Sequence, residues 1–338
     1  MRDLKFIQAC PDDAYYTWQV HLWLESLRNI GQSDKAISLI FTPKNREINP
    51  NWKQIIDLYP EAEFHFYKDV DNVSDMLGIY IPILRPYVLW KHFKAFPELS
   101  EKAIFYCDSD ILFTKDFNID QFLEDEVCYL SNTNSYINAS YFDSKVHQVL
   151  PEKLEDYKNR DVLAELTSVI GISREICEAN NDHSGGAQYL LKNVDSYFWS
   201  KVMNDCIIIR TYLQNVNREY FQDENSGYQS WCADMWAVLW NLWARGQETK
   251  VVRELDFAWA TDPISRLETT SILHNAGIGA TQQNGHSCFY KGKYHMGSDP
   301  TKDHHLNIVL NDEKAKQYCT WHYANELKKL SNKYNLNY

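Results

Sequence analysis

The stretch AIFYCDSDILF, from Ala103 to Phe113, decides the fold that this sequence predicts. A continuous apolar run stops at Asp108-Ser109-Asp110 and then resumes. Alternation along an extended chain places Asp108 and Asp110 on the same side. Burying two unpaired carboxylates is costly, so the pattern indicates a divalent cation with oxygen ligands. The alternative is a turn in which the two side chains accept backbone N–H bonds.

The sequence before and after this stretch predicts a layered α/β fold. Short apolar runs alternate with helical patterns over the first 130 residues, which is typical of βαβ units. The carboxyl ends of the strands in such a sheet are where ligands bind, and Asp108 follows the fourth strand. We therefore expect a Rossmann-like mixed, mostly parallel sheet flanked by helices. The expected strands are Leu4 to Ala9, Ala36 to Phe41, Glu63 to Tyr67, Ala103 to Cys107 and Val127 to Leu130.

The rest of the chain adds an insertion and several helices. The polar segment 131–180 predicts an insertion or flap with a helix near Tyr157 to Leu166. Regular structure returns at Gly186 to Leu191. The segment Ser230 to Ala244 is apolar nearly all round and should be buried on most faces. The closing segment Asp312 to Tyr338 is Lys-rich and predicts a surface helix.

Composition limits the possible functions. The chain has 34 basic and 46 acidic residues, a net charge of −12, so non-specific nucleic-acid binding is not expected. The eight cysteines form no CxxC pair, and several lie within apolar runs that predict reduced core residues. No run approaches the roughly 18 apolar residues of a membrane span. We expect a soluble, cytoplasmic protein without a membrane span.

The segment Phe105 to Phe113 resembles the metal site of the glycosyltransferase A fold family. More weakly, Trp18-Gln19 and Arg85-Pro86 with Trp90 resemble segments of the plant hydroxyproline arabinosyltransferase and peptidyl-serine galactosyltransferase group. The resemblance implies a catalytic domain of that type over residues 1–300 and a C-terminal helical extension over 301–338. It also implies Mn²⁺ or Mg²⁺ at Asp108 and Asp110, bound to the diphosphate of a nucleotide-sugar donor.

The same family commonly supplies a His as a third metal ligand. His274 and His295 are the candidates, and we prefer His274 because it lies between an apolar run and a Gly-containing turn. Lys291 and Lys293, beside Gly292, are suited to pairing with a departing diphosphate. An ordinary core His and solvated loop lysines are the alternatives.

Further candidates are expected to contact the donor. Arg85 has either a diphosphate-binding role or a helix-capping role. Gly185, Gly186 and Gln188 resemble the family segment that lets the donor sugar approach the backbone, with Gln188 near the anomeric centre. The alternative for the two glycines is a tight turn before a strand.

One buried carboxylate and one aromatic residue complete the set. Asp234 lies among apolar helix neighbours, so burial should raise its pKa, as suits a catalytic base or an acid held by substrate hydroxyls. Trp259 offers a stacking face between Asp256 and Asp262, which could bind sugar hydroxyls.

The predicted function is transfer of a hexosyl or pentosyl group from a nucleoside-diphosphate sugar, expected to be a UDP-sugar, to an acceptor hydroxyl. The plant-like resemblance implies retention of anomeric configuration. The acceptor is open between a glycan, a protein, a small molecule and a modified nucleic-acid base. The alternatives are a metal-dependent nucleotidyltransferase, although Cys10-Pro11-Asp12-Asp13 is unlike a phosphate loop, and a carbohydrate-binding protein whose aspartates hold Ca²⁺.

Overall fold

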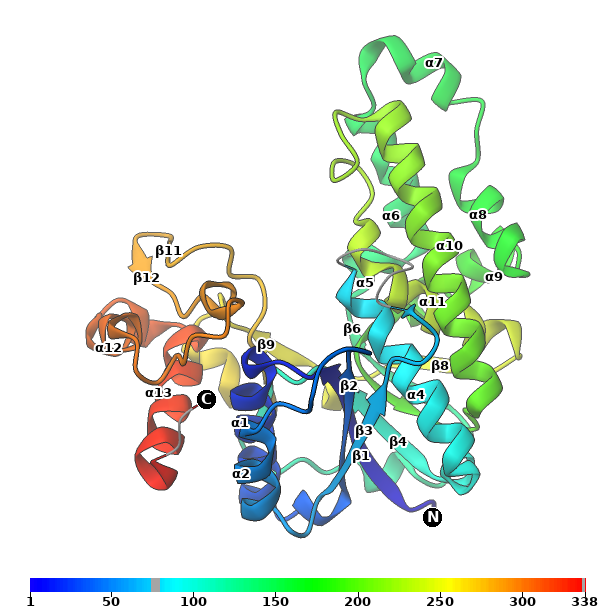
Figure 1. Cartoon of the computed structure of the whole chain (residues 1–338). Helices are drawn as coiled ribbons and strands as arrows, with labels where there is room; N and C mark the ends of the chain where they lie inside the picture. The colour runs from blue at the N-terminus through cyan, green and yellow to red at the C-terminus, as the bar shows by residue number, and fades with distance from the viewer. Residues whose placement is uncertain (74–79, 336–337) are drawn as a thin grey trace. The chain divides into compact units, whose positions relative to one another are not determined.

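A computed structural model of the chain describes residues 1–73, 80–335 and 338 (Figure 1). The chain divides into two compact units. The first unit comprises 1–3, 71–105 and 122–252, and the second comprises 4–70, 106–121 and 253–338. Among the described residues, seven strands belong to a mostly parallel mixed sheet, with β3-β2-β1 in the second unit and β4-β7-β6-β8 in the first, except that the last two residues of β4 belong to the second. This confirms the predicted mixed α/β architecture.

Three parallel strands and two helices open the second unit. Strand β2 is buried at every position, as expected of a parallel strand covered on both faces. Helix α1 begins where the Asp13 side chain accepts a hydrogen bond from the Tyr15 backbone N–H. These elements are β1 (Leu4–Pro11), α1 (Ala14–Asn29), β2 (Ala36–Thr42), α2 (Asn51–Leu58) and β3 (Glu63–Lys68).

A second, three-stranded sheet of order β5-β10-β9 lies in the same unit. Its hydrophobic core joins side chains from α1, β5, β9, β10 and the two C-terminal helices, including Trp18, Leu112, Leu273 and Tyr323. The expectation of a surface helix at the C-terminus is therefore only partly right, because one face of α13 is buried. The elements are β5 (Ile111–Phe113), β9 (Phe257–Trp259), β10 (Ile272–His274), β11 (Gln282–Gln283), β12 (His286–Ser287), α12 (His304–Asn311) and α13 (Cys319–Tyr334).

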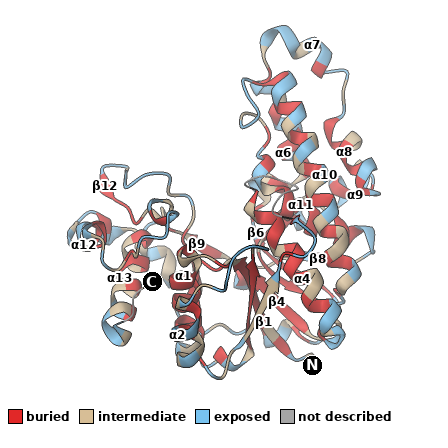
Figure 2. Ribbon diagram, in the orientation of Figure 1, coloured by how far each residue is buried: buried red, intermediate tan, exposed pale blue. Residues whose placement is uncertain are grey.

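The first unit contributes the remaining strands and the longest helix, α10. Strand β6 pairs antiparallel with β7 and parallel with β8, which makes the sheet mixed. The strands are largely buried, whereas α7 is largely exposed (Figure 2). The elements are α4 (Leu84–Ala95), β4 (Ala103–Cys107), β6 (Cys128–Asn132), β7 (Gly185–Leu191), α10 (Ser196–Tyr220), α11 (Ala233–Ala244) and β8 (Thr249–Val251).

The predicted insertion at 131–180 is helical. The helix predicted over Tyr157 to Leu166 is wrong in its bounds, because a turn follows Tyr157 and the Asp161 side chain caps a new helix by accepting from the Ala164 N–H at 2.9 Å. These helices gather along α10 in the first unit (Figure 1). They are α5 (Asn134–Ile137), α6 (Ala139–Ser144), α7 (Leu154–Tyr157), α8 (Val162–Ile170) and α9 (Arg174–Ala179).

Helix α11 confirms the prediction of a helix buried on most faces, with one exception. Trp231 lies before the helix in a 3-10 turn (Ser230–Cys232) and is 57% exposed. Its apolar neighbours in sequence gave no sign that the helix starts only at Ala233. Among the described residues, no helix is both long enough and apolar enough to cross a membrane.

Candidate metal and diphosphate site

Strand pairing in the second unit brings His274 to the acidic motif. Strand β5 follows Asp110 directly and pairs antiparallel with β10, in a register that places Ile111 opposite His274. The Asn275 N–H donates to the Asp110 carbonyl at 3.0 Å and extends this pairing by one step. A residue 164 positions later in sequence (110 to 274) is thus held beside the motif by backbone hydrogen bonds.

The side chains of Asp108, Asp110 and His274 form a compact donor set. One ligand atom from each lies within 4.8 Å of the others. The His274 Nε2 atom is 3.5 Å from Asp108 Oδ2 and 3.4 Å from Asp110 Oδ1. Asp110 and His274 are buried, whereas Asp108 is partly exposed. Two carboxylates and an imidazole with one open side suit a divalent cation that also binds a ligand from solvent.

Lys291 supplies positive charge to this cluster. Its ammonium group forms an ion pair with Asp110 Oδ2 and comes from a 3-10 turn (Lys291–Tyr294). Burial would raise the pKa of Asp110, but the charges of Lys291 and His274 outweigh burial and hold that pKa below its usual range. Asp110 is therefore an anion at neutral pH whose charge needs a cationic partner.

The imidazole in the donor set favours a transition ion such as Mn²⁺ over Ca²⁺ and Mg²⁺, which both prefer oxygen ligands. Ca²⁺ takes oxygen ligands almost without exception, whereas an imidazole suits first-row transition ions. Among the described residues, one group of His, Cys, Asp or Glu side chains has a spacing that could hold a metal, and it consists of these three. The capped-turn alternative does not account for a buried His placed against both carboxylates.

Of the other candidates in the second unit, Trp259 contacts the donor set, whereas Lys293 and His295 have other partners. Trp259 lies in register with His274 and stacks on it, with ring centroids 5.7 Å apart and planes 16° apart. Lys293 pairs with Asp303 at 2.6 Å rather than with the acidic motif. His295 packs against the Tyr15 ring at 4.2 Å and does not belong to the donor set.

Asp256 and Asp262 also have structural partners. The Asp262 side chain accepts from the Trp259 N–H at 2.9 Å and so shapes the turn after β9. Asp256 lies 3.5 Å from the Arg266 guanidinium.

A second cluster lies in the first unit. Asp234, in the first turn of α11, is buried and forms an ion pair with Arg85 in α4. Burial raises the pKa of Asp234, and the charge of Arg85 opposes the rise without cancelling it. The expected burial and the expected direction of the pKa are both present. The sequence did not indicate that Arg85 is the partner of Asp234.

The small-residue segment lies beside this cluster within the same unit. A Cβ atom on Gly185 would collide with the Ser131 carbonyl, and one on Gly186 would collide with Tyr189 and Met235. Met235 follows Asp234, so the glycines border the start of α11. Close packing by itself therefore requires glycine at both positions. A role in donor binding would be an additional reason for these glycines.

The residues that follow the glycines show further constraint. Ala187 has a φ of 69°, a left-handed conformation that non-glycine residues rarely adopt. Gln188 is fully buried, and its backbone N–H donates to the Ser131 hydroxyl at 3.2 Å. Strained backbone of this kind is concentrated at functional sites.

Two aromatic residues near Asp234 were not among the predicted site residues. Burial raises the pKa of Tyr136, and the nearby Cys232 and Asp234 act on it in the same direction. Trp231 has an edge-to-face contact with Tyr80, at 5.4 Å between ring centroids. The position of Tyr136 in the insertion gave no local signal, since its closeness to Asp234 comes from the tertiary fold.

No family model matches the chain, and no curated protein sequence matches it. Several of the solved structures that the chain resembles are those of glycosyltransferases. The bifunctional glycosyltransferase WbbM is 9% identical at a TM-score of 0.44, covering 97% of this chain and 52% of that chain. Mouse xyloside xylosyltransferase 1 is 11% identical at a TM-score of 0.39, covering 81% of this chain and 98% of that chain.

A third similar structure is galactosyltransferase LgtC in complex with donor and acceptor sugar analogues. It is 13% identical at a TM-score of 0.40, covering 87% of this chain and 94% of that chain. The residues of the site, rather than these similarities, carry the function proposed below.

Proposed function

We propose that this protein is a metal-dependent glycosyltransferase that moves a sugar from a nucleoside-diphosphate sugar to an acceptor hydroxyl. The observation that carries the proposal is the convergence of Asp108, Asp110 and His274, with Lys291 paired to Asp110. A diphosphate leaving group needs concentrated positive charge, which a divalent cation together with a lysine provides.

Asp108, Asp110 and His274 would hold Mn²⁺ or Mg²⁺. When bound, the cation neutralises charge that builds up on the departing diphosphate. The Lys291 ammonium now serves as the counter-ion of Asp110. With a cation held at Asp110, Lys291 would be free of that pairing and available to bind a phosphate oxygen.

Lys293 has a smaller part in the proposal, because it is already paired with Asp303. Trp259 presents a partly exposed ring next to His274, which suits stacking on a nucleobase or a sugar. A UDP-sugar is the donor that we propose, on the basis of the resemblance of the acidic motif.

Residues of the first unit are assigned to sugar hydroxyls. Asp234 and Arg85 offer an acceptor and several donors of hydrogen bonds on rigid helices. Gln188 is assigned to the anomeric centre, with Gly185 and Gly186 permitting close approach of the backbone. Residues 1–300 make up the catalytic domain in this proposal, and retention of anomeric configuration is the outcome we favour.

The direct test is a donor screen that measures release of nucleoside diphosphate from a panel of UDP-, GDP- and CDP-sugars. We expect Mn²⁺-dependent release with at least one donor. Asp110→Asn should reduce it by on the order of 100-fold or more, because the variant loses a charged ligand of the cation. Undiminished turnover by the Asp110→Asn variant, or full turnover in EDTA, would refute the metal role.

A further inference from the structure

A separate cavity of about 490 Å³ lies in the helical insertion of the first unit. It is within the roughly 300–1,000 Å³ that small-molecule sites occupy. Its lining includes three aromatic residues, here called the base, Phe142, Tyr157 and Tyr228, which are at most 7% exposed. Its wall carries charged and amide side chains, among them Asp143, Arg160 and Arg174. None of these residues belongs to the clusters described above.

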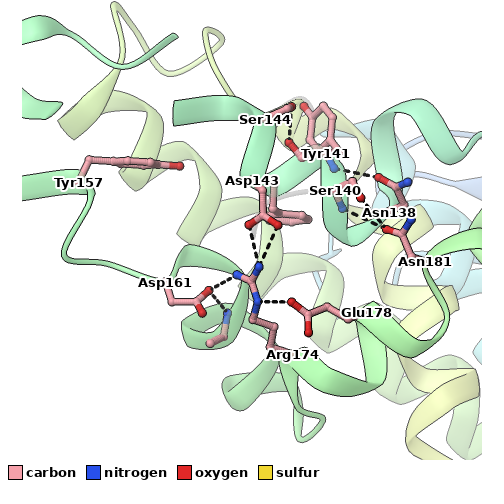
Figure 3. Close-up of polar contacts among 12 residues, drawn as sticks. Asn138, Ser140, Tyr141, Asp143, Ser144, Tyr157, Asp161, Arg174, Glu178 and Asn181 are labelled. Atoms are coloured by element: carbon pink, nitrogen blue, oxygen red, sulfur yellow. Dashed lines mark hydrogen bonds and ion pairs between the residues drawn. The ribbon is translucent and has the colours of Figure 1, made fainter. Parts of the chain in front are cut away.

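The wall is held rigid by one arginine that joins three helices. Arg174 donates to both oxygens of Asp143 at 2.8 and 2.9 Å, to Asp161 at 2.8 Å and to Glu178 at 2.7 Å. Figure 3 shows these bonds, with the Tyr157 ring pointing toward the same space. Polar groups that are fixed before a ligand arrives lower the entropic cost of binding.

The base is fixed as well. The Tyr157 and Tyr228 hydroxyl groups are 2.5 Å apart, and the Tyr228 hydroxyl also lies 3.4 Å from the Phe142 carbonyl. Asp156, beside Tyr157, accepts from the Tyr220 hydroxyl at 2.8 Å and ties the α7 turn to α10. The cavity therefore has a small aromatic base and a polar wall, both preformed.

The carboxylates around the wall outnumber its guanidinium groups, and each guanidinium is already engaged by more than one of them. Arg174 is shared by three carboxylates, and Arg160 is bound to Glu165 and lies 3.6 Å from Glu219. A phosphate or carboxylate ligand would have to compete with these carboxylates for each guanidinium. A neutral ligand does not, because it can accept from and donate to the exposed edges of the same groups.

We propose that this cavity binds a neutral oligosaccharide. A sugar has a small apolar C–H face that suits a limited aromatic base, and several hydroxyls that suit paired carboxylates and guanidinium groups. If the proposed transferase function holds, the cavity is suited to retain part of a glycan acceptor, and this use alone rests on that function.

The test is saturation-transfer NMR on the full chain without metal or nucleotide, using lactose, cellobiose, maltose, mannobiose and xylobiose. Val146→Trp would fill the cavity from its rim. Val169→Trp is the matched control, because Val169 is 59% exposed in α8 and does not line the cavity. Circular dichroism and thermal unfolding would establish that both variants fold.

We expect at least one disaccharide to receive saturation from the wild-type protein and from Val169→Trp, and to lose at least nine-tenths of it in Val146→Trp. Absence of transfer to all five sugars would overturn the proposal. Retention of the signal in Val146→Trp would overturn it too. In separate metal-free runs, UDP and inorganic phosphate are added as competitors, and displacement of the sugar by either would contradict the proposal of a neutral ligand. Since neither metal nor donor is present, these outcomes are independent of the proposed catalysis.

Discussion

The Lys291→Met variant tests how much the positive charge of Lys291 stabilises the metal site. The substitution keeps most of the side-chain volume and removes the cation that now partners Asp110. Removing one member of a fully buried ion pair costs about 3–5 kcal/mol. The Lys291 side chain is 30% exposed, and His274 is a second partner 3.4 Å from Asp110, so we expect a smaller loss of about 1.5–3 kcal/mol.

The assay is urea unfolding in EDTA and in Mn²⁺, followed by fluorescence. We expect Lys291→Met to unfold at lower urea in EDTA and Mn²⁺ to restore most of the loss, because the ion replaces the missing charge. Mn²⁺ should also bind this variant more tightly than the wild type, since it no longer competes with Lys291. Lys293→Met, whose partner is Asp303, should show neither effect. Equal stability of Lys291→Met and wild type in EDTA would refute the reasoning.

Three further predictions concern other parts of the chain. Arg85→Met should destabilise the fold by about 3 kcal/mol, because it leaves Asp234 buried and unpaired, and Arg85→Met with Asp234→Asn should recover part of the loss in urea unfolding. If the double variant instead lost as much stability as the two single variants together, the two side chains would not be coupled. Gly185→Ala should destabilise the fold more than Gly186→Ala, because its new methyl group meets backbone atoms rather than the ends of side chains. Calorimetry would compare the two variants, and a larger loss for Gly186→Ala would contradict this reasoning. Burial lowers the pKa of His21 to about 3, so the unfolded chain binds a proton below about pH 6.5 that the folded chain does not bind until about pH 3. Stability should fall through that window as pH drops, and a pH series on His21→Gln that kept the wild-type slope would contradict this.

The strands and the acidic motif could be read from the sequence because their signals are local. The apolar run that ends at Asp108 predicted β4 with its observed bounds. The helix predicted near Tyr157 is misplaced because Asp161 caps a new helix that begins at Val162. The apolar pattern includes Trp231 in the predicted buried helix, because periodicity does not mark where a 3-10 turn precedes a helix.

The partners within each site were harder to predict. The position of His274 before a turn predicts it as a ligand, and the register of β5 with β10 supplies the physical reason for its closeness to Asp110. The pairing of Arg85 with Asp234, 149 positions apart, depends on how α4 and α11 pack and leaves no pattern in a single sequence. The ion pairs of Arg174 with Asp143 and Asp161 could not be predicted from the sequence for the same reason.

The central claim is that Asp108, Asp110 and His274 hold a divalent cation that binds a nucleoside diphosphate. The most direct test is calorimetric titration of UDP into the protein with Mn²⁺, with the same titration in EDTA and with Asp110→Asn. We predict micromolar to low-millimolar binding with Mn²⁺, weakened at least tenfold in EDTA and in the variant, since each removes the bridge between carboxylates and phosphates. Equally tight UDP binding in all three titrations, or none with Mn²⁺ from any of UDP, GDP and CDP, would contradict it.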